Sequence, residues 1–223
     1  MFSATFLITF AADLADDQKQ ALTSDIAALG AALSDVYCIG EVIPAATQNA
    51  GDVLFEIGFP NQDAYEAAKQ AGEWADLKGI LADPAQVVLY QFVAYGDGLF
   101  QLTDTERSRG HRVLLMNVRD GADPAMVEEA AQMSHHMQDF IDGFNNSKVA
   151  AVVESEGSNS WDYVFECDYE DPSVYSGAYL MHPIHITFID RYFEPACEQW
   201  VFTPDLCTSV IEVDGPFLAN YAD

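Results

Sequence analysis

The sequence carries the same order of structural signals twice, and this repetition limits the folds that the chain can adopt. A short β-rich run opens each half, at residues 2–10 and 113–118. Acidic residues suited to capping a helix follow each run, at Asp16–Asp17 in the first half and Asp123–Pro124 in the second. A helix is therefore expected after the first strand of each half.

Apolar residues recur at spacings of three and four behind both caps, as expected for one buried face of a helix. They are Leu22, Ile26, Leu29 and Leu33 in the first half, and Met126, Ala130, Met133, Met137, Phe140 and Phe144 in the second. Further β-rich runs follow in each half, two of them separated by a turn-rich stretch. The predicted strands are 36–42, 53–59 and 87–93, then 149–153, 163–169 and 208–213, and the turn-rich stretches are 47–52 and 155–160.

A second helical region lies between the last two strands of each half. Tyr65 and Tyr179 are 114 residues apart, and Trp74 and Phe188 have the same separation. The two halves therefore keep one register over about ten residues of this region, by the same reading of internal repeats.

Each half reads β-α-β-β-α-β, which is the ferredoxin-like plan, so the fold class is α+β. Two such sheets can bury their remaining faces against each other, and we expect one chain to form an intramolecular version of a dimeric α/β barrel. The predicted organisation is a first repeat at 1–95, a linker at 96–110, a second repeat at 111–214 and a C-terminal tail at 215–223.

Composition narrows the classes of partner. The 223 residues include 9 Lys and Arg against 36 Asp and Glu, a formal net charge of −27, which disfavours nucleic acid and anionic membranes because binding phosphate needs clustered cations. No apolar run reaches the ~20 residues of a membrane span, and the four scattered cysteines suggest buried reduced thiols. A cytoplasmic protein is expected, either a monomer or a homodimer paired through exposed sheet edges.

All five histidines fall in the second repeat, which indicates that this repeat carries the site and that the first is a scaffold. The densest group is the segment 178–185, with Tyr179, His182 and His185. Pro183 disfavours helical backbone at His182, so a helix is expected to end or kink there. A phenol and an imidazole facing one space can serve as an acid–base pair.

The segment Tyr179–Phe188, with the strands around it, resembles the stress-responsive dimeric α/β-barrel (Dabb) family, whose hallmark is an H-P-x-H-x-x-F stretch. Within that family it is most similar to the olivetolic acid cyclase type of cofactor-free polyketide cyclase. The resemblance implies that Tyr179 and His185 form the acid–base pair and that His111, which opens the repeat's first strand, belongs to the active site. A further active-site histidine of that cyclase falls near Tyr163, so the sequence departs from the pattern there.

These observations together predict a cofactor-independent lyase or cyclase acting on a small aromatic or polyketide-like molecule by ring closure, dehydration or retro-aldol cleavage. His185 is the expected base, Tyr179 orients or donates, and His111 binds a polar substituent. The cavity is expected between the second repeat's sheet and its helices. The expected substrate-binding residues are Tyr163, Phe165, His182, Phe188, Tyr192 and Trp200.

Other readings stay open at the level of sequence. The same cavity suits a non-catalytic ligand-binding or stress-response protein. His182, His185 and His111 with Asp162 or Glu166 could form a metal site, and one histidine could be an axial haem ligand. The pair His135–His136 is expected at a helix interface or in solvent.

Overall fold

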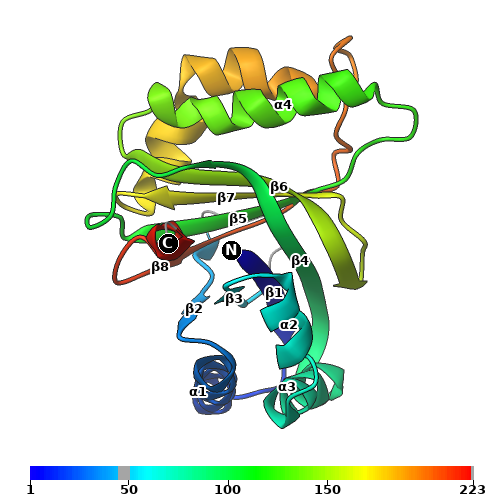
Figure 1. The fold of residues 1–223 in the computed structure, drawn as a ribbon, viewed down its shortest axis with the longest axis vertical. Coiled ribbons are helices and arrows are strands. Elements are labelled where there is room, and N and C mark those ends of the chain that lie inside the picture. Colours follow the sequence, from blue (N-terminus) through cyan, green and yellow to red (C-terminus); the bar gives the residue numbers. More distant parts are fainter. Residues whose placement is uncertain (45–50, 222–223) are drawn as a thin grey trace. The chain divides into compact units, whose positions relative to one another are not determined.

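The computed structural model describes residues 1–44 and 51–221, and these divide into two compact units (Figure 1). Unit 1 contains residues 1–42, 51–97 and 152–160, and unit 2 contains 43–44, 98–151 and 161–221. Most of the predicted turn at 47–52 and the last two residues of the predicted tail lie outside the described residues.

Unit 1 is an antiparallel sheet with helices. Its strands run in the order β2-β3-β1-β4, and each adjacent pair is antiparallel. The elements are β1 (Phe2–Phe10), α1 (Asp16–Leu33), β2 (Val36–Glu41), β3 (Val53–Phe59), α2 (Gln62–Ala68), α3 (Gly72–Ala82) and β4 (Val87–Gln101), which leaves the unit after Asp97. Phe6, Phe55 and Phe92 from three adjacent strands pack with Trp74 of α3 to form its core.

Unit 2 repeats this order with the strands β6-β7-β5-β8. Helix α4 and the helical segments near residues 175–192 lie side by side over its strands (Figure 1). The elements are β5 (Gly110–Met116), α4 (Pro124–His136), η2 (Met137–Asp139), β6 (Phe144–Gly157), β7 (Tyr163–Tyr169), η3 (Tyr175–Tyr179), η4 (His185–Ile189), η5 (Asp190–Tyr192), β8 (Cys207–Glu212) and η6 (Phe217–Tyr221).

The α+β class and the doubled βαββαβ order are confirmed. In both units the second strand of the repeat pairs with the third, the third with the first, and the first with the fourth. This strand order is that of the ferredoxin-like plan, and the central strands β1, β3, β5 and β7 are buried along nearly their whole length.

The row of buried residues predicted for the first helix of this repeat, α4, is wrong at its C-terminal end. The helix ends at His136 and one 3₁₀ turn follows, so Phe140 is exposed and Phe144 opens strand β6 instead. Gly143 adopts a positive φ of 79°, a conformation that glycine tolerates and that takes the chain out of the helical turn. Phe144 is buried in the core all the same, because the strand delivers it to the space below the helix.

The second helical region of unit 2 also departs from the register seen in the sequence. Tyr65 and Tyr179 are both buried, as are Trp74 and Ile189, whereas Phe188 is 43% exposed. The segments η3 and η4 are π-helical, and their wider turns shift the buried face by one residue from Phe188 to Ile189. Short π-helical segments are frequent at functional sites.

The four cysteines are free thiols, and burial raises the pKa of Cys167 and of Cys207 to about 12. Cys167 and Cys207 are therefore protonated and unreactive at neutral pH. Among the helices of the described residues, none combines the length and the apolar character needed to cross a membrane.

The net charge of −27 gives a first prediction: the melting temperature rises when NaCl is increased from about 0.05 M to 1 M. Repulsion between carboxylates opposes the compact state, and salt screens it beyond a Debye length that falls from roughly 14 Å to about 3 Å. We expect an increase of several degrees by circular dichroism, since about 1 kcal/mol corresponds to ~2–4 °C at this chain length. A melting temperature that stays constant or falls over this range would contradict the argument.

Candidate functional site

Unit 2 contains a cavity of about 170 Å³ between its sheet and its helices. Its walls are aromatic and aliphatic with a few polar groups, and an engineered apolar cavity of about 150 Å³ is known to admit benzene. The cavity therefore has the size of a one-ring molecule. Its lining includes Arg112, Leu114, Phe165 and Thr208 from the strands, and Ser134, Tyr175, Tyr179, His185, Ile189, Asp190 and Phe193 from the helical side.

Tyr179 is the last residue of the π-helical segment η3 and is almost fully buried. Its phenol oxygen accepts a hydrogen bond of 3.0 Å from Arg112 Nη1, so the phenol proton stays available for donation. Burial raises the pKa of Tyr179 well above its usual range, although the nearby Arg112 guanidinium opposes the shift. The group is therefore a proton donor at neutral pH and not a base.

His185 opens the second π-helical segment, η4, and its ring lies edge-on to that of Tyr179, with 4.8 Å between ring centroids. Burial, and then the positive charge of Arg112, lower the pKa of His185 to about 4. At neutral pH the imidazole is consequently uncharged and able to accept a proton.

A carboxylate lies behind this imidazole. Asp190 Oδ1 is 3.3 Å from His185 Nδ1, close enough for an ion-pair contact but not aligned as a hydrogen bond. Burial raises the pKa of Asp190. A small rotation of either side chain would let Nδ1–H donate to Asp190, which leaves Nε2 as the proton acceptor.

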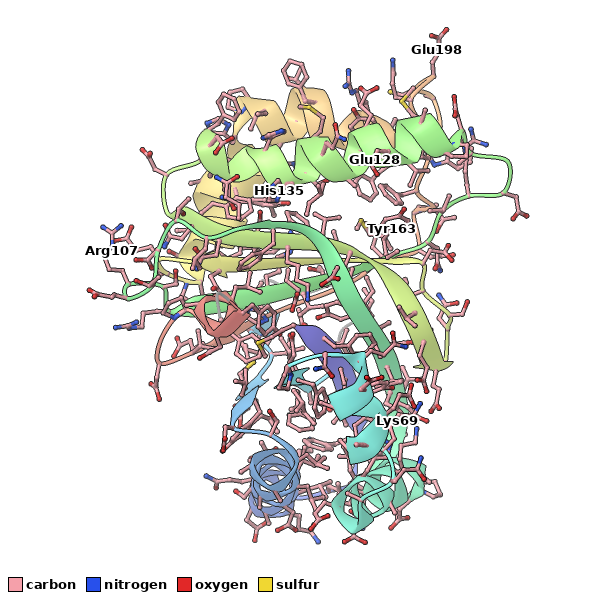
Figure 2. The ribbon with its side chains drawn as sticks, in the orientation of Figure 1. Lys69, Arg107, Glu128, His135, Tyr163 and Glu198 are labelled. Carbon is pink, nitrogen blue, oxygen red and sulfur yellow. The ribbon has the colours of Figure 1, made fainter. Side chains whose placement is uncertain are left out.

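The structure brings together three of the residues predicted for the site and leaves the others elsewhere. Phe165 lines the cavity with Tyr179 and His185. Tyr163 lies between sheet and helix α4 in the core, with its ring 6.2 Å from that of Phe202 (Figure 2). Trp200 donates its indole N–H to the Phe202 carbonyl and lies under Arg119, also away from the cavity.

Three further placements on the helical segments are corrected. Phe188 points outward beneath Arg191, because the π-helical turns place Ile189 on the buried face. Tyr192 is buried but turns toward α4, where its phenol donates to Glu129. His182 accepts a hydrogen bond from the backbone N–H of Ile184 and braces the turn, outside the lining of the cavity.

His111 does not share the cavity, so the prediction that it binds a substituent there is wrong. Consecutive strand residues face opposite sides of a sheet, and Arg112 occupies the cavity side. His111 is buried on the other side, with Nδ1 2.9 Å from Asp168 Oδ1 and its ring against Phe217. The alternative metal site, which combined His182 and His185 with His111, is not assembled, because His111 lies on the opposite side of the sheet from His185.

The two adjacent histidines of α4, His135 and His136, have different surroundings, because neighbouring residues of a helix point about 100° apart. His135 lies on the side of α4 that faces the sheet and its Nδ1 is 2.9 Å from Ser147 Oγ, whereas His136 is exposed beside Asp139 (Figure 2). Both positions agree with the expected interface and solvent roles.

Sequence reasoning missed Arg112 and Asp190. Arg112 directly precedes the apolar residues 113–116. A single cation at the start of a strand that is expected to be buried is the signal that could have indicated it. Asp190 is five residues after His185, a spacing that brings side chains together only in a π-helical turn, so no helical or strand period could have indicated it.

Comparisons with known proteins agree with this architecture. Residues 111–203 match the family model described as the Stress responsive A/B Barrel Domain. No curated protein sequence matches the chain significantly.

Three similar solved structures extend over nearly the whole chain. An anthrone oxidase-like protein has a TM-score of 0.63 at 11% identity, covering 95% of this chain and 90% of its own. A putative monooxygenase from Fusobacterium nucleatum has a TM-score of 0.59 at 11% identity, covering 95% and 91%. A putative monooxygenase from Lactobacillus acidophilus has a TM-score of 0.55 at 12% identity, covering 96% and 97%. At these identities the likeness shows the fold alone.

Proposed function

We propose that unit 2 binds a small aromatic molecule and transfers a proton within it, and the match of residues 111–203 to the Stress responsive A/B Barrel Domain model supports this proposal. The observation that carries the proposal is the cavity itself, which is lined by both an uncharged imidazole and a protonated phenol and has room for a molecule with one aromatic ring. Such a pair can serve as the acid and base of a cofactor-independent lyase or cyclase.

The chemistry assigned to the pair is simple. The imidazole of His185 removes a proton from a carbon next to the ring, and the C–H electron pair moves toward an adjacent carbonyl to give an enolate. Tyr179 donates a hydrogen bond to the enolate oxygen as its charge develops. Return of the proton to another atom completes an isomerisation, and expulsion of a leaving group from the enolate completes a cleavage. Ring closure instead requires the enolate carbon to attack a second carbonyl carbon of the same molecule, whose oxygen then takes up the proton.

The lining of the cavity also supports the proposal. Phe165, Tyr175 and Phe193 give the walls aromatic contact area, and the closed site strengthens the few polar contacts. The solved structure named as an anthrone oxidase-like protein shares the fold at 11% identity and adds no evidence on the reaction. The proposal therefore rests on the cavity.

The test uses 2-indanone, a small neutral ketone whose CH₂ groups lie between a benzene ring and a carbonyl. We expect the protein to accelerate exchange of these protons in D₂O, measured by proton NMR. His185→Gln lowers the catalysed rate by about 100-fold or more, and Tyr179→Phe by about tenfold or more, since general acid–base groups typically contribute 10²–10⁴-fold.

His136→Gln is the matched control, because this histidine is solvent-exposed on α4 and lies outside the cavity. It should exchange 2-indanone at the wild-type rate. If the wild-type protein does not exceed the buffer rate, or if His185→Gln and Tyr179→Phe each change it less than threefold, the catalytic proposal is wrong and the non-catalytic ligand-binding alternative takes its place.

A further inference from the structure

Arg112 is the most unusual side chain of unit 2. It lies in the middle of the sheet on β5, 4% exposed, and it forms part of the cavity wall. The rings of Tyr175, Tyr179 and Phe165 lie 4.8, 5.1 and 5.7 Å from its guanidinium carbon. Aromatic faces stabilise a cation but give it no counter-charge.

No carboxylate in residues 1–44 and 51–221 forms a hydrogen bond or ion pair with Arg112. The chain has four acidic residues for each basic one, so a partner was readily available. The comparison within unit 2 is direct, because the other buried cation, Lys148, lies 3.9 Å from the carboxylate of buried Glu166. A buried charge without a partner is strongly unfavourable in a folded protein, which points to a role for Arg112 beyond packing.

The hydrogen bonds of Arg112 leave donors for a ligand. Nε donates to Thr208 Oγ1 at 3.0 Å and Nη1 donates to the Tyr179 phenol at 3.0 Å. A guanidinium has five N–H groups, so these oxygens use two. Both partners also line the cavity, and they hold the planar group at its wall.

We propose that Arg112 recognises an anionic oxygen, and that the molecules bound in this cavity are one-ring aromatic compounds bearing a carboxylate, phenolate or enolate oxygen. The proposal rests on the proposed function in one respect, since the enolate formed by proton transfer belongs to this class. The planar fork suits such oxygens, and charge-assisted hydrogen bonds in a closed site are stronger than neutral ones.

Binding of an anion also changes His185. The positive charge of Arg112 is one of the two causes that keep the pKa of His185 low, and a bound anion offsets that charge. The imidazole becomes a stronger base once a negative oxygen occupies the site. Proton abstraction by His185 is therefore increasingly favoured as negative charge develops on the enolate oxygen.

The experiment measures binding without turnover. Benzoate and benzamide have nearly the same shape, but only benzoate carries a negative charge at pH 7. By isothermal titration calorimetry on the full chain, we expect benzoate to bind about 10-fold to 100-fold more tightly than benzamide, the range that one charge-assisted hydrogen bond gives. Equal affinities, or a preference for benzamide, would overturn the proposal on the wild-type protein alone.

Arg112→Met then removes the charge and keeps an apolar side chain of similar length, and it should reduce the benzoate preference to less than about threefold. Arg119→Met is the control, because Arg119 also lies over an aromatic ring, that of Trp200, but outside the cavity. A preference retained in Arg112→Met with native circular dichroism would overturn the proposal. Benzoate selectivity without 2-indanone exchange would leave this inference standing and remove only the catalytic function.

Discussion

We expect kcat/KM for exchange of 2-indanone to fall tenfold for each pH unit below about pH 4 and to stay level between about pH 5.5 and 8. This quantity reports the free enzyme, in which the proposed base is His185, with a pKa near 4. The active form is the unprotonated imidazole, so activity is complete well above that pKa and is lost as the pH falls through it. An ordinary histidine would place the same change near pH 6.5.

Two variants separate the causes of the low pKa. His185→Gln should leave a small rate with no acid limb. Arg112→Met should move the limb upward, because one of the two causes is removed, but not as far as pH 6.5, since burial remains. The rates are corrected for exchange in buffer, and circular dichroism confirms folding at each pH. A wild-type limb between pH 6 and 7 would mean that His185 is solvated or is not the base.

The doubled architecture was predictable because it depends on short-range signals. β-rich runs and helix caps such as Asp123 are local patterns, their repetition in both halves gives the β-α-β-β-α-β plan, and the observed strand order is the one that this plan predicts. The prediction fails where a local sequence pattern is compatible with two different paths of the chain. Met137 and Phe140 continue the helical stripe in the sequence, but the positive φ at Gly143 requires the chain to leave the helix before Phe144.

The site was predictable in its motif and not in its lining. The Tyr179 and His185 positions came from a family resemblance, which carries geometry that spacing alone does not contain. The 114-residue register pairs Phe188 with Trp74, but the π-helical segments turn Phe188 outward and Ile189 inward. Arg112 and His111 are adjacent on one strand and face opposite sides of the sheet, and the sequence does not show which of them faces the cavity.

Replacing Asp168 by alanine should lower the free energy of unfolding by about 3–5 kcal/mol, because three buried polar groups lose the carboxylate that they contact. Asp168 is fully buried in unit 2 and joins three elements through its carboxylate. Oδ2 accepts from the Asn146 side-chain amide on β6 and from the Leu218 backbone N–H in η6, both at 2.9 Å, and Oδ1 lies 2.9 Å from His111 Nδ1 on β5. Alanine leaves these polar groups buried without this acceptor.

Urea unfolding of the full chain, followed by circular dichroism, measures the change. Glu170→Ala is the control two residues along the same segment, since its side chain is exposed, and it should alter stability by less than about 0.5 kcal/mol. Asp168→Asn should fall between them, because an amide oxygen still accepts hydrogen bonds but carries no charge opposite His111. A decrease in the free energy of unfolding of less than about 1 kcal/mol for Asp168→Ala would contradict this prediction. It would mean that water or a shifted η6 segment replaces the carboxylate, and that the position of His111 does not depend on Asp168.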